Sequence, residues 1–265
     1  DNGIEMSAFG TIENTEFATQ YEQSERVKQI RRLNSESCVD DKKDINILRN
    51  RMFYEAEQTL LKNKDTNIAF IEAPTGAGKS NLAMNCSLKL LDKNINKIFY
   101  VYPFNTLVEQ NYDTLEKIYG QTDIFKSIAV INSITPIPLN GTRKFWENLD
   151  KEENEKFYQK ALLDRQFLNY PFILTTHVNL FQIMFGCERE AAISFYQLAG
   201  SVVVLDEIQS YKNVLWTEIM MFLQCYSRLL NMKIIIMSAT LPKLDMLTGN
   251  HEKVVNLIEN PEKYF

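Results

Sequence analysis

The chain has 265 residues, a formal net charge of −5 and 45% hydrophobic residues. This composition supports a buried core and excludes an intrinsically disordered chain, and the acidic balance excludes a uniformly basic nucleic-acid binder of the histone type. The length corresponds to one large domain or two small ones.

The four cysteines are far apart and include no Cys-x-x-Cys pair, which argues against a disulfide scaffold and fits a reducing compartment. No apolar run in the sequence reaches the length of a membrane span, and no secretory signal peptide is visible. We therefore expect a cytoplasmic protein without a membrane partner.

Residues 1–44 are polar and charged, with few apolar clusters. We expect a linker or a partial N-terminal element there, in which charged residues from Glu22 to Arg32 line a solvated helix. Residues 45–265 are expected to form the folded domain, because patterned apolar segments begin at Ile45.

Within this domain, helical and strand patterns alternate. Helices are predicted at 45–61, 81–91, 106–119, 178–185 and 214–230, and strands at 67–72, 97–102, 127–131, 172–175, 201–205 and 233–237. The charged segment 145–166 is predicted to be a helical surface insertion, and 254–258 a last strand. Near-continuous apolar strands alternating with helices are typical of a mainly parallel sheet flanked by helices, a three-layer α/β fold.

A glycine-rich stretch follows the first predicted strand and reads Ala-Pro-Thr-Gly-Ala-Gly-Lys-Ser. Backbone N–H groups in such a turn can hold phosphate oxygens, and the helix that follows adds partial positive charge. Lys79 can reach the outer phosphates of a nucleotide, and the Ser80 hydroxyl can bind Mg²⁺. Ala73 replaces the first glycine of the general pattern, which is tolerable at negative φ. The predicted nucleotide contacts are Pro74, Thr75, Gly76, Ala77, Gly78, Lys79 and Ser80.

Asp206 and Glu207 follow the valine-rich strand 201–205. Phosphoryl transfer needs one group that holds a metal ion and another that orients the attacking water, and two adjacent strand-end carboxylates can divide these tasks. We assign Asp206 to Mg²⁺ and Glu207 to the general base. A solvated turn is the alternative.

Three neutral polar residues, Gln209, Ser238 and Thr240, also follow apolar strands. Their hydrogen-bonding groups suit a relay that senses the γ-phosphate. Ser238 and Thr240 could equally cap the next segment, where Leu241-Pro242 forces a break.

Another set of polar residues follows strands away from the glycine-rich stretch. Short polar groups and helix N-terminal amides suit a sugar-phosphate backbone and read no base sequence. Ordinary helix capping is an equal alternative, and a satisfied, partly buried histidine is the favoured interpretation of His177. The candidates for nucleic-acid contact are Phe104, Asn105, Thr106 and Thr176.

The glycine-rich stretch, Asp-Glu-Ile-Gln at 206–209 and Ser-Ala-Thr-Leu-Pro at 238–242 together resemble the first motor lobe of superfamily 2 helicases, over about residues 45–242. With glutamine last in the second motif, the chain looks most like the helicase–nuclease of type I CRISPR systems. Tyr102–Thr106 and Thr175–Phe181 are similar to nucleic-acid-contacting motifs of that family.

The resemblance implies a RecA-like P-loop lobe at 45–265 that binds ATP and Mg²⁺. It implies ATP hydrolysis that drives 3′-to-5′ movement on single-stranded DNA in antiviral defence, with recruitment by an RNA-guided surveillance complex. By resemblance, the catalytic set is Lys79, Asp206, Glu207 and Gln209, the metal ligands are Ser80 and Asp206, and the coupling residues are Ser238 and Thr240.

The family also has a histidine–aspartate nuclease domain and a second lobe that supplies arginine fingers. We expect neither within this chain, which has only His177 and His251 and no His-Asp pair. Because the transition state needs an arginine from the second lobe, we expect the isolated chain to hydrolyse ATP poorly.

Two other functions fit the sequence. The chain could be an RNA or general DNA helicase lobe outside CRISPR, or a non-hydrolysing module that docks a partner through a sheet edge or the 145–166 segment. A small-molecule kinase is disfavoured, because it would not need the motifs at 206–209 and 238–242. Arg49 and Gln58 are candidates for contact with adenine.

Overall fold

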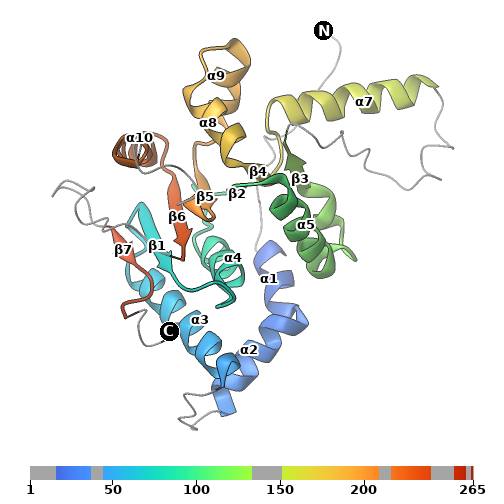
Figure 1. Cartoon of the computed structure of the whole chain (residues 1–265). Helices are drawn as coiled ribbons and strands as arrows, with labels where there is room; N and C mark the ends of the chain where they lie inside the picture. Colours follow the sequence, from blue (N-terminus) through green and yellow to red (C-terminus); the bar gives the residue numbers. More distant parts are fainter. Residues whose placement is uncertain are drawn as a thin grey trace.

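The computed structural model describes residues 16–36, 44–132, 151–208, 216–239, 254–260 and Tyr264. In this part of the chain, seven parallel strands form one sheet in the order β3-β4-β2-β5-β6-β1-β7 (Figure 1). The strands are β1 (Ile68–Glu72), β2 (Lys97–Tyr102), β3 (Ile128–Ile131), β4 (Phe172–Thr176), β5 (Ser201–Leu205), β6 (Lys233–Ser238) and β7 (Val255–Asn256).

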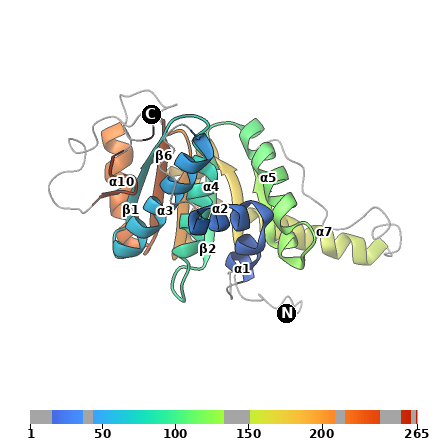
Figure 2. The same ribbon diagram turned by 90° about the horizontal axis from the view of Figure 1, so that it is seen from below.

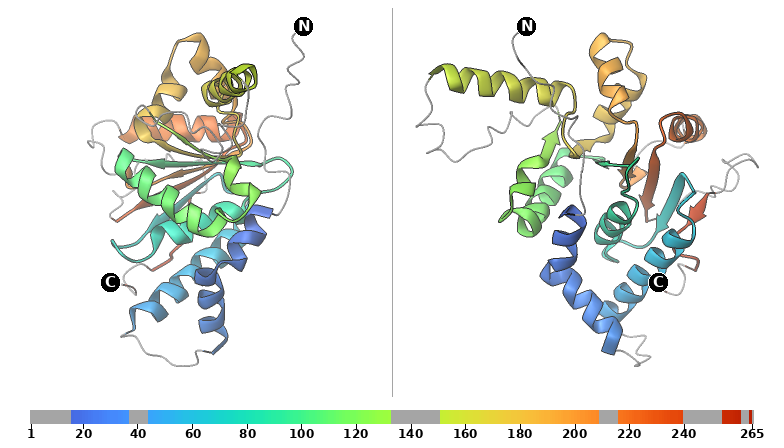
Figure 3. Two further views of the ribbon diagram at one scale, coloured as in Figure 1. Left: turned by 90° about the vertical axis from the view of Figure 1, so that its right-hand side faces the viewer. Right: turned by 180° about the vertical axis from the view of Figure 1, so that it is seen from behind.

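Helices lie on both faces of this sheet, which is the middle of three layers (Figure 3, left). The helices are α1 (Glu16–Gln23), α2 (Glu25–Glu36), α3 (Ile45–Lys62), α4 (Lys79–Lys89), α5 (Asn105–Tyr119), the 3-10 turn η1 (Asp123–Ser127), α7 (Lys151–Gln166), α8 (His177–Phe185), α9 (Arg189–Tyr196) and α10 (Trp216–Leu229). Helices α1 to α5 pack on one face, and α8 and α10 on the other. The predicted three-layer α/β class with a parallel sheet is confirmed.

The strands read as apolar runs because both of their faces are covered. Every residue of β2, β4 and β5 is buried. In β2, Tyr100 and Tyr102 face the cluster under α1, α4 and α5, whereas Phe99 and Val101 face the opposite cluster under α8 and α10. This alternation is the two-residue period of a strand.

The predicted elements between 45 and 238 agree with the structure within a few residues, but the 3-10 turn η1 and the helix α9 are not among them. The sequence analysis predicts no helix between 186 and 200, where the structure has α9. For the predicted insertion 145–166, the structure has α7 from Lys151, which extends away from the sheet (Figure 1), and residues 145–150 lie outside the described part. No helix among the described residues is both long and apolar enough to cross a bilayer.

The N-terminal helices α1 and α2 pack against the domain. Phe17 and Tyr21 of α1 are buried, and the Phe17 ring lies 5.4 Å from Tyr119 and 6.0 Å from Phe172, centroid to centroid. The Tyr119 hydroxyl donates to the Phe17 carbonyl oxygen at 3.0 Å. Residues 16–36 are therefore part of the helical layer over β2 and β4.

A group of charged side chains joins α1 and α2 to α3 and α4. The Arg31 guanidinium lies 2.8 Å from Glu22 and 2.7 Å from Glu57, and Lys89 lies 3.0 Å from Glu22. The Asn85 amide donates to Glu57 at 2.6 Å. The expected solvated helix is thus only partly correct: these pairs are half-buried, and their hydrogen bonds connect the N-terminal helices to the helix that follows the glycine-rich stretch.

Candidate nucleotide-binding site

The glycine-rich stretch forms the turn between β1 and α4. Gly76 and Gly78 have φ values of 82° and 88°, in the left-handed region that residues with a Cβ rarely adopt. Nothing lies within 4 Å of where a Cβ would stand at either glycine, so backbone conformation rather than space requires glycine here. Gly78 is the N-cap of α4, so the turn leads directly into that helix.

Ala73 shows why alanine is tolerated at the first position of the stretch. Its φ is not in the left-handed region, its side chain is fully buried in the core, and its N–H donates to the Ser238 carbonyl oxygen at 3.2 Å. The backbone of the turn is therefore tied to the end of β6.

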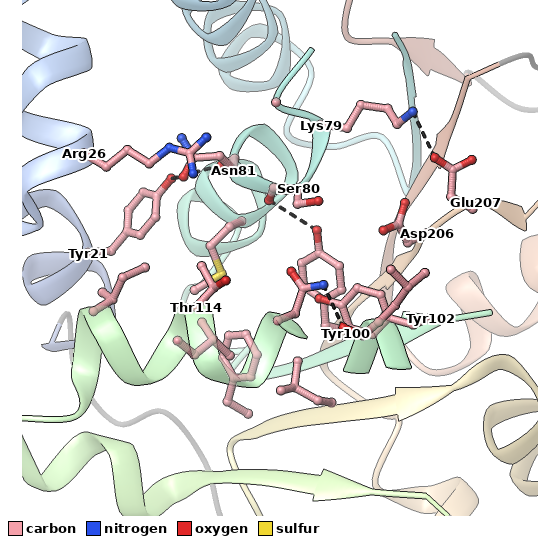
Figure 4. Close-up of a pocket in the computed structure, with 18 of the residues that line it drawn as sticks. Tyr21, Arg26, Lys79, Ser80, Asn81, Tyr100, Tyr102, Thr114, Asp206 and Glu207 are labelled. Atoms are coloured by element: carbon pink, nitrogen blue, oxygen red, sulfur yellow. Dashed lines mark hydrogen bonds and ion pairs between the residues drawn. The ribbon is translucent and has the colours of Figure 1, made fainter. Parts of the chain in front are cut away.

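Lys79 lies between the turn and the end of β5. Its Nζ donates to the Ala73 carbonyl oxygen at 3.0 Å and lies 3.0 Å from Oε1 of Glu207 (Figure 4). The lysine side chain is 8% exposed and the glutamate 26% exposed. The two charges neutralise each other in a partly desolvated position.

The side chains of Asp206 and Glu207 point in different directions because the two residues have different backbone conformations. The Asp206 N–H donates to the Val101 carbonyl oxygen at 2.9 Å, which extends the ladder between β5 and β2. Glu207 then has φ 47°, a strained value for a residue with a side chain. Burial raises the pKa of Asp206 to about 6; the negative charge of Glu207 adds to this shift and Lys79 opposes it.

These residues line one cavity of about 450 Å³. The sequence-predicted residues along it are Thr75, Gly76, Gly78, Lys79, Ser80, Asp206 and Glu207. Behind Ser80, the Tyr100 hydroxyl donates to the Ser80 carbonyl oxygen at 3.2 Å. The structure thus brings the turn, the start of α4 and the end of β5 to a common space of the size typical of small-molecule sites.

The candidate nucleic-acid contacts lie outside this cavity, at the ends of β2 and β4. These strands are neighbours, with Tyr102 opposite Thr176. Phe104 caps α5 and is 62% exposed. Asn105 and Thr106 begin α5, and Thr106 is exposed.

Thr176 caps α8 by accepting a hydrogen bond from the Asn179 N–H at 3.4 Å, so the capping interpretation describes its geometry. His177 is fully buried, and burial lowers its pKa to about 4. It is therefore a neutral histidine that is fully buried, whereas the sequence analysis expects partial burial. Ser238 is buried at the end of β6, and Gln209 and Thr240 lie outside the described residues.

Arg49 contacts the glycine-rich turn rather than an open surface. Its Nε and Nη2 atoms donate to the Gly76 carbonyl oxygen at 3.0 and 2.6 Å. Gln58, the other adenine candidate, is exposed on α3 and does not line the cavity. The sequence analysis does not identify Tyr21 or Arg26, which also line the cavity, because they lie in another segment and carry no motif. Tyr102 lines the cavity as well, whereas the sequence analysis assigns it to a nucleic-acid-contacting motif.

The comparisons with known proteins agree with this architecture. The family model described as DEAD/DEAH box helicase matches residues 54–247. The CRISPR-associated nuclease/helicase Cas3 of Haloferax volcanii is 23% identical over 188 residues, which cover 67% of this chain and 19% of that protein.

Solved helicase structures share the fold. The structure of T. fusca Cas3 with AMPPNP has a TM-score of 0.50 at 18% identity, and the match covers 72% of this chain and 21% of the Cas3 chain. The structure of the DUF1998 helicase MrfA bound to DNA has a TM-score of 0.50 at 18% identity, and the match covers 77% of this chain and 25% of the MrfA chain. The chain spans about a fifth of the length of these Cas3 relatives. Since the family model covers more than half of the sequence, this chain belongs to the DEAD/DEAH box helicases and forms a RecA-like motor domain of that family.

Proposed function

We propose that the chain binds ATP with Mg²⁺ in the cavity between the glycine-rich turn and the Asp206–Glu207 pair, and that hydrolysis drives movement along nucleic acid. One observation carries this proposal: Lys79, Asp206 and Glu207, which come from segments more than 100 residues apart, line the same cavity, and Lys79 contacts Glu207 at 3.0 Å. Cas3 structures with AMPPNP and ADP support nucleotide binding by this fold.

The turn and Lys79 hold the phosphates in this proposal. Backbone N–H groups at the start of α4 point toward a bound anion, and the helix dipole favours negative charge there. Lys79 exchanges Glu207 for the β- and γ-phosphate oxygens. Because the lysine is nearly buried, its attraction to phosphate is screened little by solvent.

The Ser80 hydroxyl and the Asp206 carboxylate would hold Mg²⁺. The donor set fits, because oxygen ligands are those that Mg²⁺ prefers, and Ser80 is exposed to the cavity. The raised pKa of Asp206 also fits, since a buried carboxylate beside a second negative charge gains most from a cation. When bound, Mg²⁺ neutralises charge between the β- and γ-phosphates.

Glu207 acts as the general base. Its left-handed backbone directs its carboxylate toward Lys79 rather than along the strand, near the end of the turn where the γ-phosphate would lie. In this position the carboxylate can orient the attacking water and accept its proton. Gln209, Ser238 and Thr240 complete the proposed set as sensors that couple hydrolysis to movement.

Phe104, Asn105, Thr106 and Thr176 are the proposed contacts with single-stranded DNA. Support comes from the exposure of Phe104 and from the adjacency of β2 and β4, which places these residues along one edge of the sheet. By likeness to Cas3 we further propose 3′-to-5′ movement, a role in CRISPR antiviral defence with an RNA-guided surveillance complex, and cooperation with a second lobe and a nuclease domain.

The test compares ATP hydrolysis and translocation by the intact protein with and without Lys79→Ala, in the presence of single-stranded DNA or RNA. The matched control is Lys93→Ala, which removes an exposed lysine beyond α4. The proposal predicts DNA-stimulated hydrolysis that Lys79→Ala abolishes and the control retains. Stimulation by RNA alone favours the helicase lobe outside CRISPR, and partner binding without any hydrolysis in the wild type favours the docking module.

A further inference from the structure

Two buried tyrosine hydroxyls contact the first turn of α4, the turn that carries Ser80. The Tyr21 hydroxyl of α1 donates to Asn81, whose carbonyl oxygen and Oδ1 both lie 3.0 Å from it. The Tyr100 hydroxyl of β2 donates to the Ser80 carbonyl oxygen at 3.2 Å. The two tyrosines are 1% and 3% exposed. Figure 4 shows that Tyr21 reaches the start of α4 from the side of the N-terminal helices, whereas Tyr100 reaches it from the sheet.

The two contacts together fix the rotation of α4 about its own axis. Successive residues of an α-helix are turned by about 100° around that axis, so the carbonyl groups of Ser80 and Asn81 lie at different positions around it. One hydrogen bond would allow the helix to roll about a single contact, whereas two bonds from different elements set its rotation. The Ser80 side chain leaves the helix in the same turn, so the direction of its hydroxyl depends on this rotation.

Helix α1 can hold Tyr21 in place because α1 is itself anchored on α5. Figure 2 shows α4 with α3 on one side and α1 and α5 on the other. The Tyr119 hydroxyl of α5 donates to the Phe17 carbonyl oxygen at 3.0 Å, and the Gln20 amide donates to the Ile118 carbonyl oxygen at 3.2 Å. Helix α1 therefore joins the end of α5 to the start of α4.

Tyr119 is buried like Tyr21 but contacts a different part of the molecule. A buried tyrosine hydroxyl needs a hydrogen-bond partner in any fold, and Tyr119 finds one in the Phe17 carbonyl oxygen. Tyr21 and Tyr119 are thus a matched pair: both are at most 1% exposed, and each joins α1 to another helix through one hydroxyl. Only Tyr21 of this pair contacts the residue next to Ser80.

We propose that Tyr21 is a positioning residue of the nucleotide site: through Asn81 it sets the rotation of the first turn of α4, and so aims the Ser80 hydroxyl at Mg²⁺. This inference rests on the proposed function, because it takes Ser80 as a metal ligand. Loss of the Tyr21 hydroxyl should loosen the start of α4 and weaken the part of nucleotide binding that depends on Mg²⁺. The phosphate contacts should remain, because Arg49 of α3 holds the Gly76 carbonyl oxygen in the turn.

The test is equilibrium titration of the chain with a fluorescent ATP analogue, with and without Mg²⁺. The ratio of the two dissociation constants measures how much Mg²⁺ contributes to binding. Tyr21→Phe keeps the ring and removes only the hydroxyl. It should lower this ratio by roughly threefold to tenfold and change binding without Mg²⁺ by less than about twofold. Tyr119→Phe, the matched control, should leave the ratio within about twofold of the wild type.

Hydrogen exchange of the chain without nucleotide or Mg²⁺ gives an independent measurement. Tyr21→Phe should speed amide exchange at the start of α4 by roughly twofold to tenfold, because one hydrogen bond that holds this turn is lost. Tyr119→Phe should leave exchange there unchanged and speed it in α1 and at the end of α5. Cooperative urea denaturation of both variants confirms that each is folded.

The outcomes separate the role of Tyr21 from the proposed function. Equal effects of Tyr21→Phe and Tyr119→Phe on the Mg²⁺ ratio, or unchanged exchange at the start of α4 in Tyr21→Phe, would overturn the role of Tyr21 and leave the proposed nucleotide site standing. A wild type that binds the analogue equally with and without Mg²⁺ would overturn the proposed metal site, and the role of Tyr21 with it.

Discussion

Lys79 and Glu207 contact each other at 3.0 Å, although Lys79 begins α4 and Glu207 follows the end of β5, on either side of the proposed nucleotide site. Each is a residue that the proposed chemistry requires: one to bind phosphate, the other to orient water. Their ion pair keeps both side chains at the cavity and keeps their charges balanced. A bound nucleotide must separate this ion pair. Removal of Lys79 should therefore weaken nucleotide binding, whereas removal of the Glu207 charge should slow hydrolysis.

Glu207→Gln should separate binding from hydrolysis. The amide cannot accept the proton of the attacking water, so the turnover of ATP by the intact protein should fall by about 10² to 10⁴. Nucleotide affinity should be unchanged or higher, because Lys79 no longer has a charged partner to leave. Steady-state hydrolysis and equilibrium nucleotide binding, measured on the same variant, check this. Glu109→Gln, on the exposed side of α5, is the control, and equal turnover in both variants would disprove the role of Glu207 as base.

Asp206→Asn should stabilise the chain in the presence of a chelator while abolishing Mg²⁺-dependent nucleotide binding. The folded state raises the pKa of Asp206 to about 6, so the folded chain binds more protons than the unfolded chain between about pH 4 and 6. Stability from this group is present below pH 4 and is lost as pH rises through 6. At pH 7.5 the substitution should add roughly 1–3 kcal/mol to the free energy of unfolding.

Urea denaturation of both forms at pH 5 and pH 7.5 measures this difference. The wild type should lose stability relative to Asp206→Asn as pH rises. A variant that is less stable than the wild type at pH 7.5 would show that the carboxylate is not held at an electrostatic cost in the folded chain.

Arg31→Ala should destabilise the whole domain, not only its N-terminal helices. The substitution leaves Glu57, whose side chain is 9% exposed, without its charged partner, which should lower the free energy of unfolding by roughly 3–5 kcal/mol. Lys28→Ala, three residues earlier in the same helix, removes only an exposed pair with Glu25 and should change it by less than about 1 kcal/mol. If urea denaturation shows the same small loss for Arg31→Ala as for Lys28→Ala, residues 16–36 do not stabilise the domain and behave as a linker.

Phe104→Ala should weaken binding of single-stranded DNA without changing nucleotide affinity. An exposed ring just before α5 can stack on a base, an interaction of about 1–3 kcal/mol, so the dissociation constant should rise about 5- to 150-fold. Phe222→Ala is the matched control, because Phe222 is also an exposed phenylalanine but lies on α10. Fluorescence anisotropy with a labelled oligonucleotide gives both values, and a larger loss in Phe222→Ala would place the DNA on the other face.

The strands and most helices could be predicted because the physics that forms them is local. Residues 202–205 are all apolar, a pattern typical of a strand that is covered on both faces, and they lie in β5. The helical spacing of apolar residues over 45–61 matches α3 closely. The packing of α1 could not be predicted, because its buried face consists of only Phe17 and Tyr21, and their partners are distant in sequence. Phe17 packs against Tyr119 and Phe172, and Tyr21 donates to Asn81, 60 positions away. Helix α9 has only eight residues, too few for a clear period.

The candidate site shows the same division. The motifs indicate which residues lie at the ends of β1 and β5, because a parallel sheet brings its carboxyl ends to one edge. They do not indicate the ion pair between Lys79 and Glu207, since the pairing depends on the left-handed backbone of Glu207. Nor do they reveal that Arg49 donates to the Gly76 carbonyl oxygen or that Arg26 reaches the cavity, because both arginines lie in segments without motifs.

The most direct test of the central claim is equilibrium titration of the chain with a fluorescent ATP analogue, with and without Mg²⁺, in the wild type, Lys79→Ala, Asp206→Asn and the double variant. A shared site predicts Mg²⁺-dependent saturable binding that each single substitution weakens by roughly tenfold or more, with non-additive losses in the double variant. Binding that stays unchanged in both single variants would contradict the claim that the turn and the end of β5 hold one nucleotide between them.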